Sequence, residues 1–246
     1  DNFPRAFFYD SLNYYRPNLN GLFWQYYKNK SNISAFLDWT SRQTDTERET
    51  FIMGGSGIYR KSIFYGKFQY YMYHRAARGI KDSTDHLHDN GLFHAALGID
   101  LSEKTCFDTL YVNLGFLQGQ ERRRNDPGNW QKPKGTLIEA NIEWEGLGIK
   151  NTFYKGDGLM VFYKTPYNQN DLYWGDPFYQ ATTYNRTDLY LNIIKSARVN
   201  AKFIYSFHYC EEKMSDQQQL LININLDNNK KNEEKKEPYV WTKWFH

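Results

Sequence analysis

A serine and a histidine two residues apart, Ser206 and His208, come nearest in this chain to a nucleophile with its base. Ester hydrolysis by a serine needs a histidine within hydrogen-bond reach to take the hydroxyl proton. In an extended segment, residues two apart point to the same side. Ser206 and His208 point away from Phe203, Tyr205 and Phe207, so an amphipathic strand would place them on its polar face.

A second group that could do chemistry is the run Asp85, His86, Leu87, His88, Asp89, which offers two imidazoles and two carboxylates within five residues. In an extended loop His86 and His88 would share a side and could bind one divalent ion. Such sites normally take ligands from a second segment as well, and the sequence indicates none. A solvated loop is the better interpretation, so we expect no metal and no other cofactor.

Positive charge is concentrated at Arg122, Arg123 and Arg124, where a strand pattern gives way to a loop. A solvated charge run is the simpler interpretation, and a specific anion site is the alternative. The net charge is only +3, and the other basic residues are scattered. We therefore expect no nucleic-acid partner.

The elements that must position these groups are strands, because apolar and polar residues alternate with a period of two. Ile33, Ala35, Leu37 and Trp39 form one face of such a segment, and the same pattern returns near 137–144 and 220–226. We expect twelve strands, near 6–15, 20–29, 31–42, 50–60, 62–75, 91–102, 107–121, 135–145, 147–156, 186–197, 201–211 and 217–227.

The connections between these strands are expected to alternate between short turns and longer loops. The turns lie near 29–31, 60–62, 103–105, 145–147 and 197–200, and the last longer loop lies near 212–216. The first strand, 6–15, lacks clean alternation, and the segment could instead be a plug or an N-terminal extension. Cys106 and Cys210 fall at opposite rims of this arrangement, too far apart for a disulfide.

Aromatic residues make up 18% of the chain although its mean hydropathy is −0.80, and no stretch approaches the roughly 18 apolar residues of a membrane helix. This combination favours an all-β, antiparallel up-and-down transmembrane β-barrel over residues 1–227. Residues 228–246 then form a polar linker and an aromatic C-terminal tail. A soluble, aromatic-rich β-protein such as a lipocalin-like barrel is the alternative.

The pattern resembles the Gram-negative outer-membrane β-barrel proteins, most closely the small channel-like barrels. The resemblance covers about residues 20–227 and includes the hairpins FWQYYKNKSNISAFLDW and YRKSIFYGKFQYYMYH. It implies a location in the cell outer membrane, with outer-membrane lipid and lipopolysaccharide as partners. The tail at 228–246 could dock to a protein of an envelope complex.

The outer-membrane phospholipase family, also twelve-stranded, carries a histidine and a serine two residues apart, followed by asparagine and glycine. Here the order of Ser206 and His208 is reversed, Tyr209 and Cys210 follow, and the pair would face the lumen. The resemblance therefore implies no catalytic pair at this position. We expect that the protein is not an enzyme, and a lipid hydrolase is kept as an alternative.

Inward-facing polar residues instead favour a narrow pore for small polar solutes. The lumen candidates are Gln25, Asp38, Lys67, Gln69, Asp100, Asn113, Glu139, Asn141, Glu143, Asn223 and Asn225. The long connection at 157–185 is too aromatic for a merely solvated loop and is expected to fold into the barrel mouth. Its constriction candidates are Tyr167, Tyr173, Trp174, Phe178 and Tyr179. A non-conducting barrel that anchors an envelope complex is the second alternative.

Overall fold

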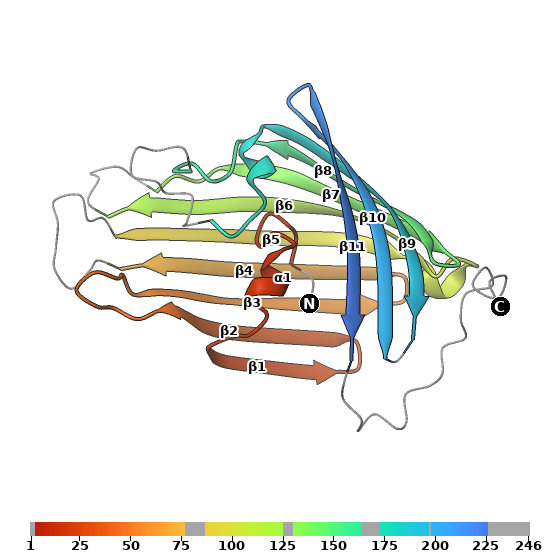
Figure 1. Cartoon of the computed structure of the whole chain (residues 1–246), viewed down its shortest axis with the longest axis horizontal. Coiled ribbons are helices and arrows are strands. Elements are labelled where there is room, and N and C mark those ends of the chain that lie inside the picture. Colours follow the sequence, from red (N-terminus) through yellow and green to blue (C-terminus); the bar gives the residue numbers. More distant parts are fainter. Residues whose placement is uncertain (1–2, 77–86, 125–129, 164–172, 197, 226–246) are drawn as a thin grey trace. The chain divides into compact units, whose positions relative to one another are not determined.

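The computed structural model describes residues 3–76, 87–124, 130–163, 173–196 and 198–225, in which 11 antiparallel strands form one sheet. Each strand pairs with its neighbours in sequence, so the sheet is an up-and-down meander (Figure 1). The strands are β1 (Gly21–Lys28), β2 (Ser31–Ser41), β3 (Thr50–Lys61), β4 (Phe64–Arg75), β5 (His88–Asp100), β6 (Thr109–Arg123), β7 (Lys134–Trp144), β8 (Leu147–Gly156), β9 (Thr183–Lys195), β10 (Val199–Cys210) and β11 (Lys213–Ile224). The described helical elements are α1 (Leu12–Tyr15), η1 (Ser102–Lys104) and η3 (Pro177–Gln180).

Eleven of the twelve predicted strands are confirmed, and the two-residue alternation of burial is clear in central strands such as β4, β5 and β6. None of the helices in the described part of the chain is long and apolar enough to cross a membrane.

The predicted strand at 6–15 is wrong, since this segment folds into turns and ends in α1. Phe7 and Phe8 are adjacent in sequence, yet their rings both lie close to Tyr71, with centroids 5.3 and 5.6 Å away. A strand would send neighbouring side chains to opposite faces. The segment therefore packs as a plug-like layer, which Figure 1 shows in front of β3 and β4.

The predicted longer loop at 212–216 is also wrong. Lys213 and Met214 already pair with Cys210 and Tyr209, so the connection from β10 to β11 is a tight turn. Glu211 and Glu212 both have positive φ angles, 46° and 70°, as a two-residue hairpin turn requires. The sequence lacks the Asn-Gly signal of such turns, which explains the error.

The described residues belong to two compact units. The first contains the described residues of 1–97, 114–137 and 154–183, and the second contains the described residues of 98–113, 138–153 and 184–246. In the first unit, Phe7 packs on Tyr71 and Trp174 packs on Tyr73, so one face of β4 is covered by the N-terminal segment and by the connection after β8. We call this side the covered face and the opposite side the open face.

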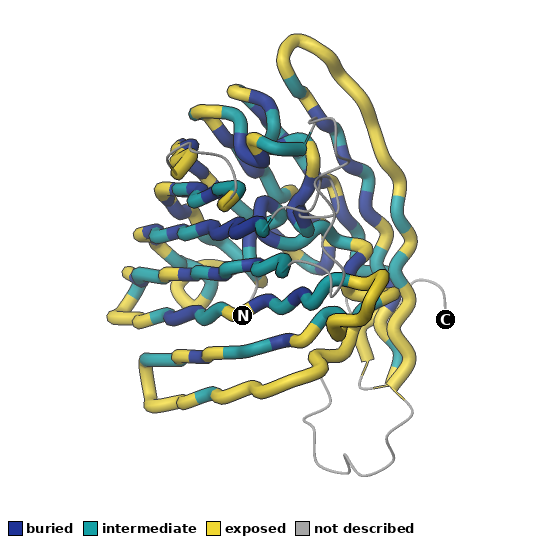
Figure 2. Tube along the Cα trace, turned by 90° about the vertical axis from the view of Figure 1, so that its left-hand side faces the viewer, coloured by how far each residue is buried: buried dark blue, intermediate teal, exposed yellow. Residues whose placement is uncertain are grey.

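The open face of the first unit carries exposed apolar side chains. Met53, Phe68 and Leu97 are 38%, 46% and 75% exposed, whereas Ile52 and Tyr71, which point to the other side, are buried. Figure 2 shows this alternation of buried and exposed residues along the strands. Such an arrangement needs an apolar environment on the open face, or a partner there, to be favourable.

The second unit buries polar groups that satisfy one another. The Arg186 guanidinium donates to Asp188 at 2.6 Å and to the Ser206 hydroxyl at 3.1 Å. The Tyr190 ring lies over Gly148, where a Cβ would meet it at 2.2 Å, and its hydroxyl donates to Glu143 at 3.0 Å. Buried polar groups without such partners would cost a few kcal/mol each.

The two end strands, β1 and β11, are exposed along most of their length (Figure 2). Each pairs with one neighbour, and no pairing between them is found in the described residues. The prediction of a closed barrel with a twelfth strand is therefore not confirmed. Both cysteines, Cys106 and Cys210, are free thiols.

Candidate functional site

Polar side chains gather on the open face of the first unit, at the end of the strands that carries the longer connections. His74 is the last residue but one of β4, Asp89 is the second residue of β5, and Arg122 is the last residue but one of β6. Tyr73 on β4 is buried in the covered face, so alternation sends His74 to the open face. We call His74, Asp89, Arg122 and Arg124 the loop-end cluster.

Asp89 is the centre of the loop-end cluster. Its side chain is only 2% exposed, and it accepts from Nε of Arg122 at 2.8 Å and from Nε of Arg124 at 2.9 Å. Nη2 of Arg124 adds a third bond at 3.1 Å. Burial alone would raise the pKa of Asp89, but the hydrogen bonds from His74, Arg124 and Arg122 outweigh burial and hold this pKa well below its usual range. Asp89 is therefore a carboxylate at neutral pH.

This carboxylate orients the imidazole of His74. Nδ1 of His74 lies 2.8 Å from Oδ1 of Asp89. Because an ionised carboxylate only accepts hydrogen bonds, Nδ1 must carry the proton of the pair. In the neutral ring the lone pair is then on Nε2, which has no hydrogen-bonding partner among the described residues. A histidine held in this tautomer by an aspartate is the arrangement of a general base in hydrolytic enzymes.

The two arginines leave the loop-end cluster with a net positive charge, since one carboxylate faces two guanidinium groups. Their side chains are 34% and 42% exposed, so they can reach a ligand from solvent. Arg122 binds Asp89 through Nε and stacks over Trp130, with its Cζ 4.3 Å from the ring centroid. A stacked and anchored guanidinium can present its terminal nitrogens to a phosphate or carboxylate.

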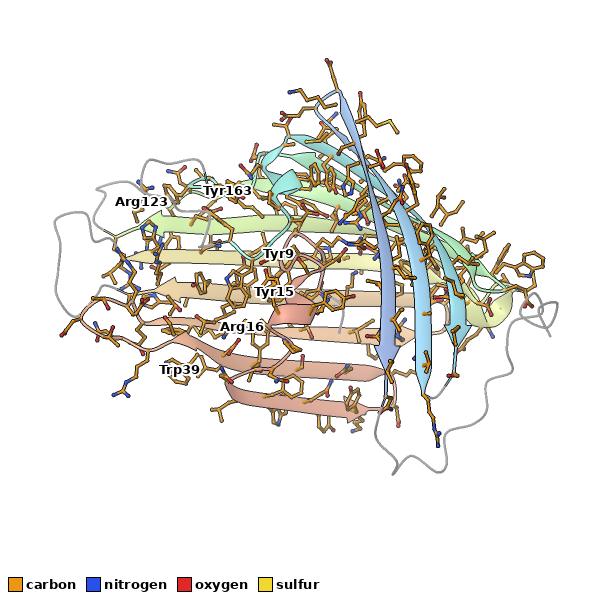
Figure 3. The ribbon with its side chains drawn as sticks, in the orientation of Figure 1. Tyr9, Tyr15, Arg16, Trp39, Arg123 and Tyr163 are labelled. Carbon is orange, nitrogen blue, oxygen red and sulfur yellow. The ribbon has the colours of Figure 1, made fainter. Side chains whose placement is uncertain are left out.

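Aromatic residues flank His74 on the open face. The Phe51 ring of β3 lies 5.0 Å from the His74 ring, and Trp39 of β2 lies 6.2 Å from Phe51. Figure 3 places Trp39 at the end of β2 that leads into the longer connection, and Arg123 at the corresponding end of β6. Arg123 alternates to the other side and stacks over Phe162 at 4.7 Å. Indole and phenyl rings beside charged groups are typical of a membrane–water interface.

Polar groups also converge in a pocket of about 180 Å³ on the covered face, which is lined by Arg16, Asp38 and Trp174 among others. A terminal nitrogen of Arg16 lies 3.4 Å from each carboxylate oxygen of Asp38, and its Cζ lies 5.0 Å over Trp174. Figure 3 shows Arg16 next to Tyr15 and Tyr9 in the N-terminal segment. Ligand pockets are usually about 300–1,000 Å³, so this one is small for a lipid headgroup.

Ser206 and His208 do not form a nucleophile–base pair. The Ser206 hydroxyl is held by Arg186, and Nδ1 of His208 lies 2.8 Å from the Tyr184 hydroxyl. Both residues are buried in the second unit. The two-residue spacing that resembles the phospholipase family therefore places two buried side chains on one face of β10, each with a partner of its own.

Several lumen candidates are bound to neighbouring side chains within their own unit. His94 bonds Gln69 at 2.9 Å, Asn113 donates to Glu139 at 3.4 Å, and Asn192 donates to Glu143 at 2.9 Å. Asn223 and Asn225 are exposed, and Gln25, Lys67, Asp100 and Asn141 are half-buried. Gln25 donates to Asn32, and Asp100 and Asn141 accept from Ser102 and Tyr190. A role of these residues in lining a pore stays a prediction.

The aromatic connection after β8 packs onto the covered face. The Tyr173 hydroxyl donates to the buried Glu121 and accepts from the Phe162 amide at 2.9 Å. Burial and the nearby Glu121 raise the pKa of Tyr173 far above its ordinary value. The Tyr179 ring lies 5.3 Å from Tyr154, and the Phe178 amide donates to Asp176. That Tyr173, Trp174, Phe178 and Tyr179 constrict a pore stays a prediction; Tyr167 lies outside the described residues.

Of the two weak metal candidates, the structure describes only His88. His88 is buried, with its ring 6.3 Å from Phe162, and His86 lies outside the described residues. Within the described ranges no group of three or more His, Cys, Asp or Glu side chains could hold a metal ion. The tail at 228–246, predicted to dock to a partner, also lies outside the described residues.

His74 and Asp89 were not predicted as a pair, although the sequence carries a signal for His74. On β4 the open-face residues Phe64, Phe68 and Met72 are apolar or aromatic up to His74. A titratable residue at the end of an apolar face is a candidate for function rather than packing. The run Arg122–Arg124, interpreted as solvated, in fact binds Asp89 through its first and third members.

Comparisons with known proteins indicate which class of reaction this chain catalyses. A protein-family model described as lipid A 3′-O-deacylase-type matches residues 1–232. Neither the curated proteins nor the solved structures include a match. The expectation that the protein is not an enzyme is wrong, because this family is an enzyme family. The match favours the lipid hydrolase alternative, and it gives no support to porin, channel or transport roles. The chain belongs to the lipid A 3′-O-deacylase-type family.

Proposed function

We propose that this protein is a hydrolase of the outer membrane that removes an ester-linked acyl chain from lipid A, and that the loop-end cluster is its active site. Family membership supports the reaction class, and the His74–Asp89 pair on the open face carries the assignment of the site. Lipid A combines sugar phosphates with fatty acyl esters, which the cluster matches with two arginines and one oriented base.

The dimensions of the sheet support a place in a bilayer. β3 contains 12 residues, which at about 3.3 Å per residue span about 40 Å. A tilt of about 40°, usual for membrane barrels, turns this length into a height of about 30 Å, the thickness of the hydrocarbon core. Exposed aromatic residues lie at both ends of β2–β4. Trp39 lies at the end of the sheet where the loop-end cluster is found, and Tyr59 and Phe64 lie at the other end, at the turn between β3 and β4. The loop-end cluster would then lie at headgroup level.

In the proposed reaction, Nε2 of His74 takes a proton from a water molecule, and the resulting hydroxide attacks the ester carbonyl carbon. The tetrahedral intermediate collapses as the bond to the sugar oxygen breaks, and the protonated His74 returns its proton to that oxygen. The products are a free fatty acid and a sugar hydroxyl. Asp89 stabilises the transient imidazolium charge.

The arginines have a separate role in this scheme. Arg122 and Arg124 hold a phosphate of lipid A, which fixes the position of the ester relative to His74. Their positive charge also favours the negative charge that develops on the ester oxygen in the transition state. Neither residue gains or loses a proton in the reaction, because guanidinium groups remain charged at all relevant pH values.

Release of fatty acid from lipopolysaccharide by the purified protein in detergent tests this proposal. The wild type should release one class of ester-linked chain, and His74→Gln should reduce the rate by about 10²–10⁴-fold, the usual contribution of a general base. His208→Gln is the matched control, because His208 belongs to the second unit and bonds the Tyr184 hydroxyl there, and that variant should keep most of the wild-type rate. Equal rates for His74→Gln and wild type would exclude the proposed site.

A further inference from the structure

A furrow on the open face of the first unit lies along the same strands as the loop-end cluster. It has a volume of about 630 Å³ and is lined mainly by apolar groups of β2 to β7. Small residues form its floor, with Gly57, Gly66 and Ala95 lying between the larger side chains Phe68, Leu97 and Phe116. These residues alternate to the side opposite the buried core, so the furrow opens to the surroundings of the sheet.

The furrow is a built feature of the backbone and not a loose gap between side chains. A Cβ on Gly57 would come within 2.3 Å of the Phe68 ring, so the absence of a side chain lets this ring lie flat against β3. A Cβ on Gly66 would make ordinary contact, 3.4 Å, with Leu97 across the floor. One wall is thus fixed by a ring that depends on a glycine, and the floor is open where Gly66 and Ala95 are small.

The furrow and the cluster are separated by a distance that a fatty acyl chain can bridge. On β5, Asp89 and Ala95 both face the open side, and the six-residue separation corresponds to about 20 Å along the strand. With a tilt of about 40° the furrow lies about 15 Å below the cluster, half of the roughly 30 Å hydrocarbon core. Acyl chains of lipids whose headgroups lie beside the cluster end at this depth.

The open face changes from polar to apolar between the two places. Gly91, between Asp89 and Phe93 on the open side, is buried beneath its neighbours, and a Cβ there would lie 3.5 Å from the Tyr70 hydroxyl and 3.6 Å from Cβ of Gln120. Tyr70 and Gln120 border this position, so polar groups end here and apolar groups begin below. The change from polar to apolar along β4 to β6 follows the change from headgroup to acyl chain in a lipid.

We infer that the furrow binds the terminal part of the acyl chain whose ester is hydrolysed at His74, and so selects substrates by chain length. This inference rests on the proposed function for the identity of the ester, but the furrow itself can be tested without hydrolysis. A long chain reaches the furrow and gains from burial there, whereas a short chain ends above it.

Chain-length selectivity is the first test, made with lipid A analogues that carry a palmitoyl or a lauroyl ester. Ala95→Leu fills the floor and should lower the palmitoyl-to-lauroyl ratio of kcat/KM about tenfold, the loss of roughly two methylene contacts. Ala35→Leu adds the same side chain to an exposed open-face position of β2 outside the furrow, and should leave the ratio unchanged. Leu97→Ala widens the furrow and should change the ratio by less than Ala95→Leu. An unchanged ratio in folded Ala95→Leu would overturn the inference.

Photo-crosslinking separates the furrow from the catalytic proposal. A palmitoyl phospholipid with a diazirine at the end of its chain, added to the protein in micelles, should label β4, β5 and β6 near Gly66, Ala95 and Phe116. Ala95→Leu should remove these adducts, and Ala35→Leu should keep them. Crosslinks spread evenly over all strands would refute acyl-chain binding. Burial of the furrow against a second copy of this chain would refute it as well. If the furrow is still labelled while His74→Gln keeps full activity, the assignment of the active site fails, and acyl-chain binding by the furrow is retained.

Discussion

Asp89→Asn is the most informative single substitution in this protein, because it keeps the shape of the side chain and removes the charge that organises the loop-end cluster. Nδ1 of His74, 2.8 Å from Asp89, would meet an amide that can donate as well as accept. A donating amide selects the opposite tautomer, in which Nε2 carries the proton and cannot act as a base. We expect kcat to fall by about 10²–10⁴-fold, the range for losing a general base.

The effect of this substitution on stability should be much smaller. Although Asp89 itself is only 2% exposed, its arginine partners are 34% and 42% exposed and can be rehydrated when the carboxylate is lost. Partly exposed ion pairs contribute about 0–1 kcal/mol each, so the free energy of unfolding should fall by only about 1–2 kcal/mol. Activity and the free energy of unfolding thus move by very different amounts.

A double-mutant cycle makes the reasoning refutable. If Asp89 acts only through His74, then His74→Gln combined with Asp89→Asn should be no slower than the slower single variant. Rates are measured as fatty acid release from lipopolysaccharide, and folding is followed by thermal unfolding of each variant. Losses that multiply in the double variant would show that the two residues act independently. A rate for Asp89→Asn within tenfold of wild type would refute the role of Asp89 outright.

Three further predictions follow from the contacts of the first unit. Replacing either Arg122 or Arg124 with Gln should raise KM for a phosphorylated lipid A substrate about 10- to 100-fold and leave KM for a dephosphorylated one little changed, because one charged hydrogen bond contributes about 1.5–3 kcal/mol; equal changes in KM for both substrates would argue against phosphate binding. Tyr173→Phe removes the hydroxyl that donates to buried Glu121, and should destabilise the protein by about 1–3 kcal/mol in denaturant unfolding, whereas Tyr163→Phe should not. Because the pKa of Asp89 is lowered by folding, its contribution to stability is complete above the ordinary carboxyl pKa near 3.9 and is lost as pH falls below it; unfolding of Asp89→Asn should therefore depend less on acid pH than that of wild type, and parallel pH curves would contradict this.

The central strands were predictable because each has two environments, one buried and one exposed, that alternate with its side chains. Where that condition fails, so did the prediction. Phe7 and Phe8 both pack against Tyr71, which no period-2 pattern describes. Glu211 and Glu212 make a tight turn without the usual residues for positive φ, so local sequence carried no signal of it.

The active-site candidate could be predicted only in part, because its members come from three strands. Arg122 and Arg124 share a face by alternation, and His74 ends an apolar face, so each was visible alone. The predicted strand began at 91 and left Asp89 in the preceding loop, whereas β5 begins at His88, which brings Asp89 to His74 and to both arginines at once. The register between β4 and β5 depends on the packing of whole strands and not on the residues of the site.

The mass of lipid A from cells that carry this protein in their outer membrane tests the central claim most directly. With the wild type, lipid A should lose the mass of one ester-linked acyl chain, and with His74→Gln present at the same level its mass should be unchanged. Identical lipid A profiles for the wild type and His74→Gln would contradict the assignment of the loop-end cluster as the deacylase site.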